Sequence, residues 1–154
     1  MKVYLVRHGS AAPGADDRVR PLTPRGRREV EATARSLAAR GIRVAEIRHS
    51  GLARARETAE ILERTLAPPH GVHETTGLLP EDDPAVAAAE LELAAEPLML
   101  VGHLPHLARL GAALVPGPML ERVQFAPGTA VGLRRAPDGW HVELIVPERP
   151  GGAR

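Results

Sequence analysis

The sequence contains no cysteine, and this absence excludes disulfide bonds and thiolate chemistry. Aromatic residues make up only 2% of the 154 residues, so the core has to be built from Leu, Val, Ile and Ala. Proteins that bind single-stranded nucleic acids need rings for stacking, and other nucleic-acid binders need a concentrated basic surface. One Trp, one Tyr, one Phe and a net charge of +1 therefore argue against nucleic-acid binding.

Long hydrophobic runs are also missing. No apolar run approaches the roughly 20 residues that a helix needs to span a bilayer, and the first residues lack the pattern of a signal peptide. We therefore expect no membrane partner and a cytoplasmic location. Without an internal repeat or a long linker, the chain is predicted to form a single domain over residues 1–146, followed by a disordered tail over 147–154.

The most informative segment that is present lies at the start of the sequence. Val3 to Val6 has the length and the β-branched content of a buried strand, and Arg7, His8 and Gly9 follow it directly. Open α/β sheets bind ligands at the carboxyl ends of their strands, and a glycine there lets the chain turn sharply close to a ligand. A guanidinium beside an imidazole then indicates an anion site with a nucleophile or an acid/base group. Taken alone, the segment also fits a strand that runs into a polar turn.

A second segment repeats the pattern of a strand followed by a helix. The run 43–48 is predicted to be a strand, and Ser50 is a favourable residue to cap the helix expected over 51–66. Apolar residues recur on one face of this helix, as is typical of an amphipathic helix packed on a sheet. Arg54 falls in its first turns, so a second guanidinium is placed at a strand-to-helix junction.

A third segment has the same form. The predicted strand 97–101 ends in Gly102 and His103, and Pro105 suits the first turn of a helix over 104–114. If the strands are parallel, the three junctions lie at one edge of the sheet. We therefore expect four side chains to converge on one anion: Arg7, His8, Arg54 and His103.

This combination of side chains fits phosphoryl transfer. Two guanidiniums match the geometry of a phosphoryl group, and helix N-termini add N–H donors. Nearby cations keep a histidine neutral and therefore nucleophilic, so a phosphoryl group can move to His8 and then to water. The arginines and the second histidine would stabilise charge in the transition state. The scheme requires no metal and no other cofactor.

The same motifs resemble those of the histidine phosphatase superfamily, and more narrowly those of its SixA-type phosphohistidine phosphatases. A strand ending in Arg-His-Gly is the hallmark of the superfamily, and the length of 154 residues fits its compact branch. The resemblance rests on four segments in matching order: Leu5–Gly9, Arg20–Gly26, Ser50–Thr58 and Val101–Pro105. It implies a phosphoglycerate mutase-like fold.

The resemblance also implies roles for individual residues. The nucleophile would be His8, and the phosphate pocket would be completed by Arg7, Arg54 and His103. Secondary candidates for substrate binding are Gly9, Ser10 and Thr23. Thr23 also has a structural interpretation, because it fits the N-cap of a helix over 24–40 that Gly41 closes.

The class of substrate depends on a proton donor. Larger relatives place a carboxylic acid after the third strand to protonate an ester leaving group, and the corresponding region here, 77–84, lacks a convincing match. Glu81 is the possible acid, whereas Asp83 fits the cap of a helix over 83–95. General acid catalysis is worth about 10²–10⁴ in rate, but a phosphorylated imidazole leaves as imidazole, whose conjugate acid has a pKa of about 6.5. The sequence therefore favours cleavage of a P–N bond over a P–O bond.

These arguments predict a phosphatase that removes phosphate from protein phosphohistidine. The resemblance implies a histidine-containing phosphotransfer domain or a similar phosphocarrier as the partner. One alternative is a phosphomonoesterase for small esters, such as sugar phosphates or nucleotide fragments. A second alternative, from another class, is a non-catalytic module that binds phosphoproteins without turnover.

The other histidines give weaker signals. His49 could flank the pocket, but we expect it in a partly exposed turn; His106 could reach the substrate, but we expect it at a solvated helix start. His141 is expected in a hairpin. His70 and His73 have the spacing of a metal-ligand pair, as do positions 103 and 106, but no third ligand follows at a recognisable spacing. We therefore expect no metal site.

The remaining pattern predicts the fold class. Strands over 2–7, 43–48, 72–75 and 97–101 alternate with helices over 24–40, 51–66, 83–95 and 104–114, and strand-like segments follow over 123–125, 130–134 and 140–146, with a turn at 137–139. This order predicts an α/β protein, a three-layer α/β/α sandwich with a mostly parallel sheet and an antiparallel addition at one edge. The polar loop 10–22 is a candidate lid or partner contact, or an ordinary surface crossover.

Overall fold

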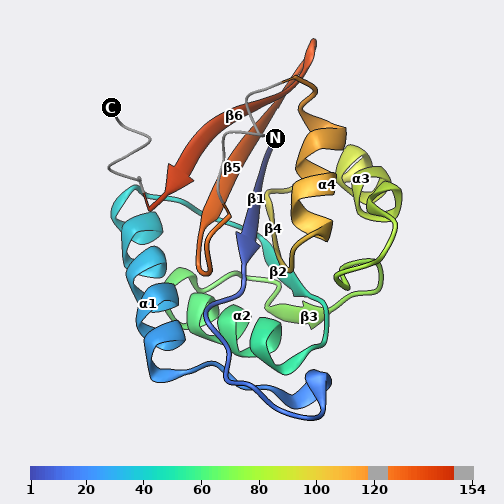
Figure 1. Ribbon diagram of the computed structural model, residues 1–154. Helices are drawn as coiled ribbons and strands as arrows, with labels where there is room; N and C mark the ends of the chain where they lie inside the picture. Colours follow the sequence, from blue (N-terminus) through green and yellow to red (C-terminus); the bar gives the residue numbers. More distant parts are fainter. Residues whose placement is uncertain (118–124, 148–154) are drawn as a thin grey trace.

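The computed structural model describes residues 1–117 and 125–147, and the strands in these ranges form one six-stranded sheet (Figure 1). The strands are β1 (Lys2–Arg7), β2 (Glu46–His49), β3 (Val72–Glu74), β4 (Leu98–Gly102), β5 (Ala130–Ala136) and β6 (Gly139–Val146). Their spatial order is β3-β2-β4-β1-β5-β6. The first four strands of this order are parallel to one another, whereas β5 pairs antiparallel with β1 and β6 pairs antiparallel with β5. The predicted antiparallel addition at one edge is confirmed.

Helices cover both faces of the sheet (Figure 1). They are α1 (Pro24–Ala39), α2 (Ala53–Leu66), α3 (Pro84–Leu93) and α4 (His106–Leu114), and a short 3-10 helix, η1, spans Asp17–Val19. Side chains of α1 and α2 share one buried apolar cluster, and side chains of α3 and α4 share another. The predicted three-layer sandwich is therefore confirmed.

Strand β1 shows why its sequence is continuously apolar. Val3 and Leu5 belong to the cluster under α3 and α4, whereas Tyr4 and Val6 belong to the cluster under α1 and α2. Successive side chains of a strand point to opposite faces, so a strand with helices on both sides has to be apolar at every position. This double burial fixes the place where β1 ends and the Arg7-His8-Gly9 segment begins.

Three helix caps agree with the predictions from the sequence. The Thr23 hydroxyl accepts a hydrogen bond from the backbone N–H of Gly26 at 2.9 Å, directly before α1. Gly41 follows the C-terminus of α1 with φ of 72°, a left-handed conformation that favours glycine. The Asp83 side chain accepts a hydrogen bond from the N–H of Ala85 and so caps α3.

The predicted cap of α2 is wrong. Leu52, not Ser50, is the N-cap residue of this helix, and no side chain caps it. The Ser50 hydroxyl lies 2.6 Å from Nε2 of His103 and accepts the N–H of Leu52 at 3.3 Å. Local propensity predicts that Ser50 caps the helix, but its side chain instead contacts His103, which lies 53 residues away in the sequence.

Several boundaries also differ from the predictions. Strand β2 begins at Glu46 instead of residue 43, and α4 begins at His106 instead of residue 104. Of the strand expected over 123–125, only Phe125 is described, and it lies outside β5. Residues 148–154 of the expected tail lie outside the described part of the chain. Within that part, no helix is long and apolar enough to cross a membrane.

Candidate active site

The register of the sheet brings two histidines together. Arg7 at the end of β1 pairs with Gly102 at the end of β4, so the residues that follow, His8 and His103, leave neighbouring strands side by side. Their ring centroids are 4.9 Å apart with an angle of 49° between the planes. His8 is 9% exposed and His103 is 1% exposed. Both imidazoles therefore sit in a largely dry environment at the carboxyl edge of the sheet.

The His8 ring is held in one orientation. Its Nδ1 lies 2.6 Å from the carbonyl oxygen of Gly9. Because a carbonyl only accepts, Nδ1 carries the proton in this contact, and Nε2 keeps its lone pair. Burial lowers the pKa of His8 to about 4; the bond to Gly9 opposes this shift, and the charges of Arg54, Arg7 and Arg20 add to it. His8 is therefore a neutral imidazole with a free nitrogen at neutral pH.

His103 is neutral for similar reasons. Burial lowers its pKa to about 3, and the neighbouring His8 and Arg54 lower it further. Nε2 is fixed by the Ser50 hydroxyl, whereas Nδ1 is buried and has no hydrogen-bond partner among the described residues. The Ser50 contact thus orients one nitrogen of the ring and leaves the other available.

Arg54 is a buried cation, which is uncommon without a partner. It is 6% exposed and comes from the first turn of α2. Its Nη1 donates to the backbone carbonyl of Asp17 at 2.9 Å, and its Nη2 donates to the Asp17 carboxylate at 3.3 Å. Two N–H groups of this guanidinium therefore point to a single residue of loop 10–22.

Arg7 is the last residue of β1. Its Nη1 donates to the carbonyl oxygen of Phe125 at 2.7 Å, and its Nε is buried with no partner in the described ranges. Burial lowers the pKa of this guanidinium from its ordinary value, and the Glu29 carboxylate opposes that shift. An arginine nevertheless remains charged at physiological pH.

Gly9 is needed for packing against a helix. A Cβ atom at this position would lie 2.6 Å from the carbonyl oxygen of Gly26 and 2.9 Å from Cγ2 of Val30, both on α1. Its backbone N–H donates to the Thr58 hydroxyl at 3.1 Å, and that hydroxyl donates to the carbonyl of Arg54 at 2.7 Å. Thr58 therefore links the turn that carries His8 to the helix that carries Arg54.

Two residues of loop 10–22, Asp17 and Arg20, belong to the site, although neither was predicted from the sequence to be a site residue. Arg20 donates through Nε to the carbonyl of Ala12 and through Nη1 to the Asp17 carboxylate, each at 2.9 Å. Its charge helps to lower the pKa of His8, and the charge of Asp17 acts on His103. The Arg20-Pro-Leu-Thr motif was a usable signal for Arg20, but nothing local in the sequence places Asp17.

The secondary candidates are occupied by other contacts. The Ser10 hydroxyl and backbone N–H both donate to the Glu29 carboxylate, at 3.0 and 2.9 Å. Thr23 caps α1, and its hydroxyl also donates to the carbonyl of Ser10 at 3.3 Å. Glu81 lies at the surface, where its carboxylate pairs with Arg109 at 3.5 Å.

Two expectations about histidines are wrong. His49 is buried, and its Nδ1 accepts the N–H of Gly51 at 3.0 Å. His106 is fully buried, because α4 starts at this residue and turns it inward beside Asp82 instead of into solvent. His70 and His73 lie at the surface, and no cluster of three or more potential metal ligands occurs in the described ranges.

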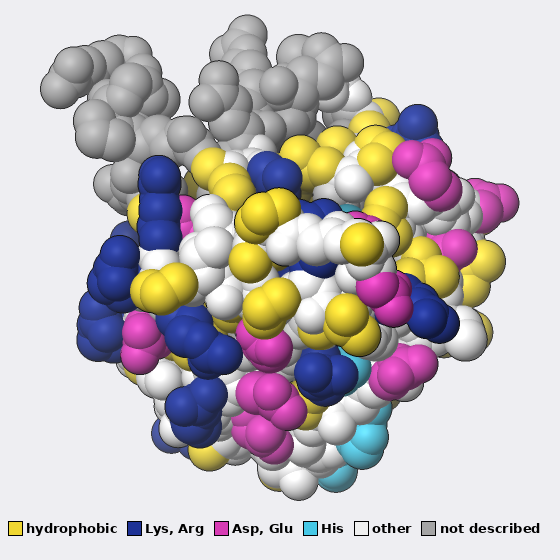
Figure 2. Space-filling view, turned by 60° about the horizontal axis from the view of Figure 1, so that its bottom comes forward, with side chains coloured by type: hydrophobic (Ala, Val, Ile, Leu, Met, Phe, Trp, Pro, Cys, Tyr) yellow, Lys and Arg dark blue, Asp and Glu magenta, His cyan; other side chains and the backbone are white. Residues whose placement is uncertain are grey.

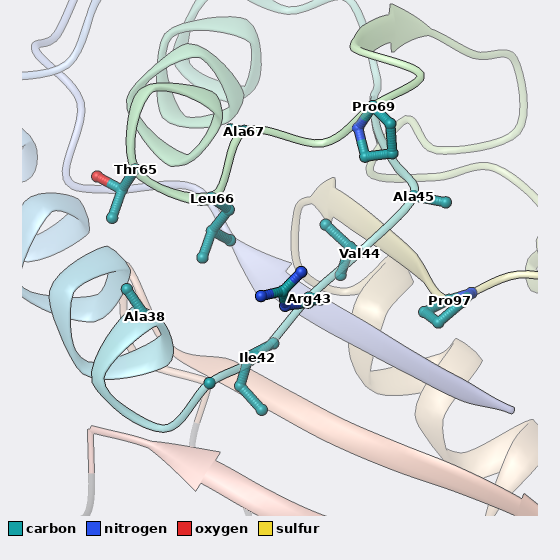
Figure 3. A pocket seen from close by; sticks show the side chains of 11 residues that line it. Ala38, Ile42, Arg43, Val44, Ala45, Thr65, Leu66, Ala67, Pro69 and Pro97 are labelled. Atoms are coloured by element: carbon teal, nitrogen blue, oxygen red, sulfur yellow. The ribbon is translucent and has the colours of Figure 1, made fainter.

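A basic surface and a groove lie apart from the residues around His8. On the face shown in Figure 2, Lys and Arg side chains gather on the side of α1, where Arg25, Arg28 and Arg35 are exposed. A groove of about 560 Å³ lies at the amino ends of β2 and β4, lined by the ends of α1 and α2 and by Arg43 (Figure 3). None of the residues that converge around His8 lines this groove, so the groove is separate from the site around His8.

Comparison with known proteins identifies relatives of this chain. Residues 3–78 match the family described as histidine phosphatase superfamily (branch 1). An uncharacterised protein of Picosynechococcus is 36% identical over 141 residues, which are 87% of this chain and 85% of that protein. Human mitochondrial serine/threonine-protein phosphatase PGAM5 is 37% identical over 83 residues, which are 53% of this chain but only 28% of PGAM5.

The solved structure of the protein histidine phosphatase SixA complexed with tungstate is similar over almost the whole fold. The TM-score is 0.85, with 27% identity over 94% of this chain and 96% of that one. The order of the motifs, the mixed sheet and these likenesses agree with one another. The chain therefore belongs to the histidine phosphatase superfamily, and it is a phosphatase with the fold of the SixA-type branch.

Proposed function

We propose that this phosphatase removes phosphate from protein phosphohistidine through a covalent intermediate on His8. The observation that carries the proposal is the state of the His8 ring. Its Nδ1 is tied to the Gly9 carbonyl, its Nε2 is free, and burial with three nearby guanidiniums holds its pKa at about 4. A neutral, oriented imidazole among cations is suited to attack a phosphorus atom that carries negative charge.

The reaction follows in two displacements. In the first, the lone pair of His8 Nε2 forms a bond to phosphorus while the P–N bond of the substrate breaks and its electron pair returns to the substrate imidazole. In the second, water attacks the phosphoryl group on His8, loses a proton to solvent, and releases phosphate with His8 neutral again. Arg7, Arg54 and the Nδ1–H of His103, whose Nε2 then accepts the Ser50 hydroxyl proton, stabilise charge on the phosphoryl oxygens in both steps.

The surroundings of the site favour a nitrogen leaving group. The carboxylates at 81–83 are engaged in contacts with other residues: Glu81 pairs with Arg109 at the surface, Asp82 accepts the N–H of Leu79, and Asp83 caps α3. An ester needs a proton donor because its leaving group is otherwise an alkoxide. A protonated phosphoimidazole needs none, because its leaving group is neutral imidazole. The likeness to the protein histidine phosphatase SixA supports the same choice.

The partner that we propose is a histidine-containing phosphotransfer domain or a similar phosphocarrier. The proposal is tested by measuring phosphate release from such a protein after it has been phosphorylated on histidine. The assay contains no added metal. Because the nucleophile is lost, His8→Ala should reduce release by about 10⁴-fold or more, and its thermal unfolding should stay within a few degrees of the parent. The parent enzyme should also release phosphate clearly faster from the phosphoprotein than from a panel of sugar phosphates.

Two results would contradict the proposal. Turnover of the phosphoprotein that survives in His8→Ala would exclude the covalent route. Rapid turnover of the sugar phosphates with none of the phosphoprotein would assign the enzyme to small esters instead.

A further inference from the structure

Loop 10–22 carries a carboxylate into a pocket that otherwise presents cations and imidazoles. Asp17 begins η1, and its Oδ2 accepts from Arg54 while its Oδ1 accepts from Arg20, at 3.3 and 2.9 Å. Its backbone carbonyl accepts a further bond from Arg54. These contacts place the carboxylate at the rim of the pocket, where its charge also acts on His103.

The side chain of Asp17 is anchored but accessible. It is 60% exposed, whereas the Arg54 side chain beneath it is only 7% exposed. A phosphoryl group that binds Arg54 therefore arrives next to the Asp17 carboxylate, and the bond to Arg20 can keep the carboxylate at the rim. A leaving group on the outer side of that phosphoryl group would lie on the exposed side of the site, where the Asp17 carboxylate is accessible.

The charge state of Asp17 decides what it can do there. The hydrogen bond from Arg20 lowers the pKa of this carboxyl group below its ordinary value; burial opposes this shift, and the charge and hydrogen bond of Arg54 add to it. At neutral pH the group is therefore an anion that accepts hydrogen bonds and has no proton to give to an alkoxide.

An acceptor of this kind favours cleavage of phosphohistidine. If the ring nitrogen that does not carry phosphorus is unprotonated, breaking the P–N bond releases an imidazolate, which is a poor leaving group. If that nitrogen carries a proton, the same step releases neutral imidazole. A carboxylate that accepts a hydrogen bond from the ring N–H favours the protonated form.

We propose that Asp17 is a specificity-determining residue for this reaction, and that its carboxylate accepts a hydrogen bond from the phosphorus-free ring nitrogen of a phosphohistidine substrate. This assignment rests on the proposed function. The proton stays on that nitrogen throughout: the electron pair of the P–N bond moves to the other ring nitrogen, the phosphoryl group moves to His8, and neutral imidazole leaves. An ester offers no such N–H, so the same carboxylate gives it no help.

The test compares two substrates and two loop variants. Asp17→Asn removes the charge, and Asp16→Asn is the matched control, because Asp16 is the neighbouring carboxylate and contacts only Arg18 in the described structure. Initial rates are measured on N-phosphoimidazole and on p-nitrophenyl phosphate from pH 5.5 to 8.5, with the His8→Ala background subtracted. The two substrates differ in whether the leaving group has a ring N–H.

At pH 8, Asp17→Asn should lower kcat/KM for N-phosphoimidazole by about tenfold or more, the effect of one charge-assisted hydrogen bond. The loss should shrink toward pH 5.5, where the substrate ring is protonated by the medium, with the imidazole pKa at about 6.5 as a guide. Hydrolysis of p-nitrophenyl phosphate should fall clearly less than hydrolysis of N-phosphoimidazole, because the ester offers the carboxylate no ring N–H, and Asp16→Asn should resemble the parent on both substrates.

Each other outcome has a distinct meaning. An equal loss on both substrates, or a loss independent of pH, would overturn the assignment and make Asp17 a structural residue of the pocket. A parent enzyme that prefers N-phosphoimidazole, with the preference unchanged in Asp17→Asn, would overturn the role of Asp17 and leave the proposed function standing. A parent enzyme that hydrolyses only the ester would overturn both.

Discussion

The pocket joins two regions of different construction. His8 and His103 are buried at the ends of β1 and β4, and the register of the sheet sets the distance between them. Asp17 and Arg20 come from loop 10–22, in which residues 13–19 are exposed. We infer that the buried region performs the chemistry common to all phosphoryl substrates, whereas the loop distinguishes leaving groups. Changes in the two regions should therefore have different effects on activity.

After the loss of the nucleophile in His8→Ala, the largest of these effects is expected at the buried cation Arg54. Arg54→Ala should reduce kcat/KM by about 10²–10³-fold, as for other preorganised donors to a transition-state oxygen. The loss should be similar for N-phosphoimidazole and p-nitrophenyl phosphate, because both present the same phosphoryl oxygens. Steady-state kinetics on both substrates check this, with circular dichroism to confirm folding. A loss confined to one substrate would contradict the assignment of Arg54 to the phosphoryl group.

A second prediction concerns stability and pH in the buried region. The pKa values of His8 and His103 are about 4 and about 3, whereas an unfolded histidine has a value of about 6.5. Between these values the unfolded chain binds more protons, so stability is complete above about pH 6.5 and falls as the pH drops toward 4. Each histidine contributes up to about 1.4 kcal/mol per pH unit in this window.

Urea unfolding of the parent and of His8→Gln at pH 7 and pH 4.5 checks this prediction. The variant should lose less stability over the interval than the parent, because one buried neutral histidine has been removed. Equal losses in the two proteins would mean that His8 does not have a lowered pKa.

A smaller effect is expected at the loop. Arg20→Ala removes a partner of Asp17 and one of the charges near His8, and it should lower kcat/KM for N-phosphoimidazole by about tenfold. The decrease for p-nitrophenyl phosphate should be smaller, since Arg54 and Arg7 remain. The ratio of the two specificity constants, relative to the parent, measures the difference. An unchanged ratio would show that Arg20 serves the phosphoryl group and not the loop carboxylate.

The smallest effect on activity is expected at Thr23, one of the secondary candidates. Its hydroxyl caps α1, so Thr23→Ala should cost about 1 kcal/mol of stability while kcat/KM stays within about twofold of the parent, as expected for a side chain that does not contact substrate. Thermal unfolding and steady-state kinetics of the same preparation separate the two effects. A large loss of activity at unchanged stability would instead restore Thr23 as a substrate contact.

The buried region was largely predictable because its signals are local. The continuous apolar run of β1, the amphipathic face of α2 and the Thr23 cap each depend on periodicity or on hydrogen bonds over a few residues. The parallel order of the strands then follows from the alternation with helices, and it brings the residues after β1 and β4 together. Family membership followed from the same segments.

The errors occurred where distant segments compete for a side chain. Ser50 was assigned to a helix cap but hydrogen-bonds to His103, and His106 was assigned to solvent but is covered by packing around α4. The contact between Asp17 and Arg54 spans 37 residues and depends on the path of an irregular loop. Neither periodicity nor capping propensity contains information about such contacts.

The most direct test of the account is to look for phosphate on His8 during turnover. Parent enzyme is mixed with a histidine-phosphorylated phosphotransfer protein, quenched at alkaline pH within milliseconds to seconds, and digested for peptide mass spectrometry. The account predicts a transient phosphoryl group on the peptide containing His8, which forms and decays fast enough to support turnover. Turnover at the same rate with no phosphate on His8 at any time would contradict it.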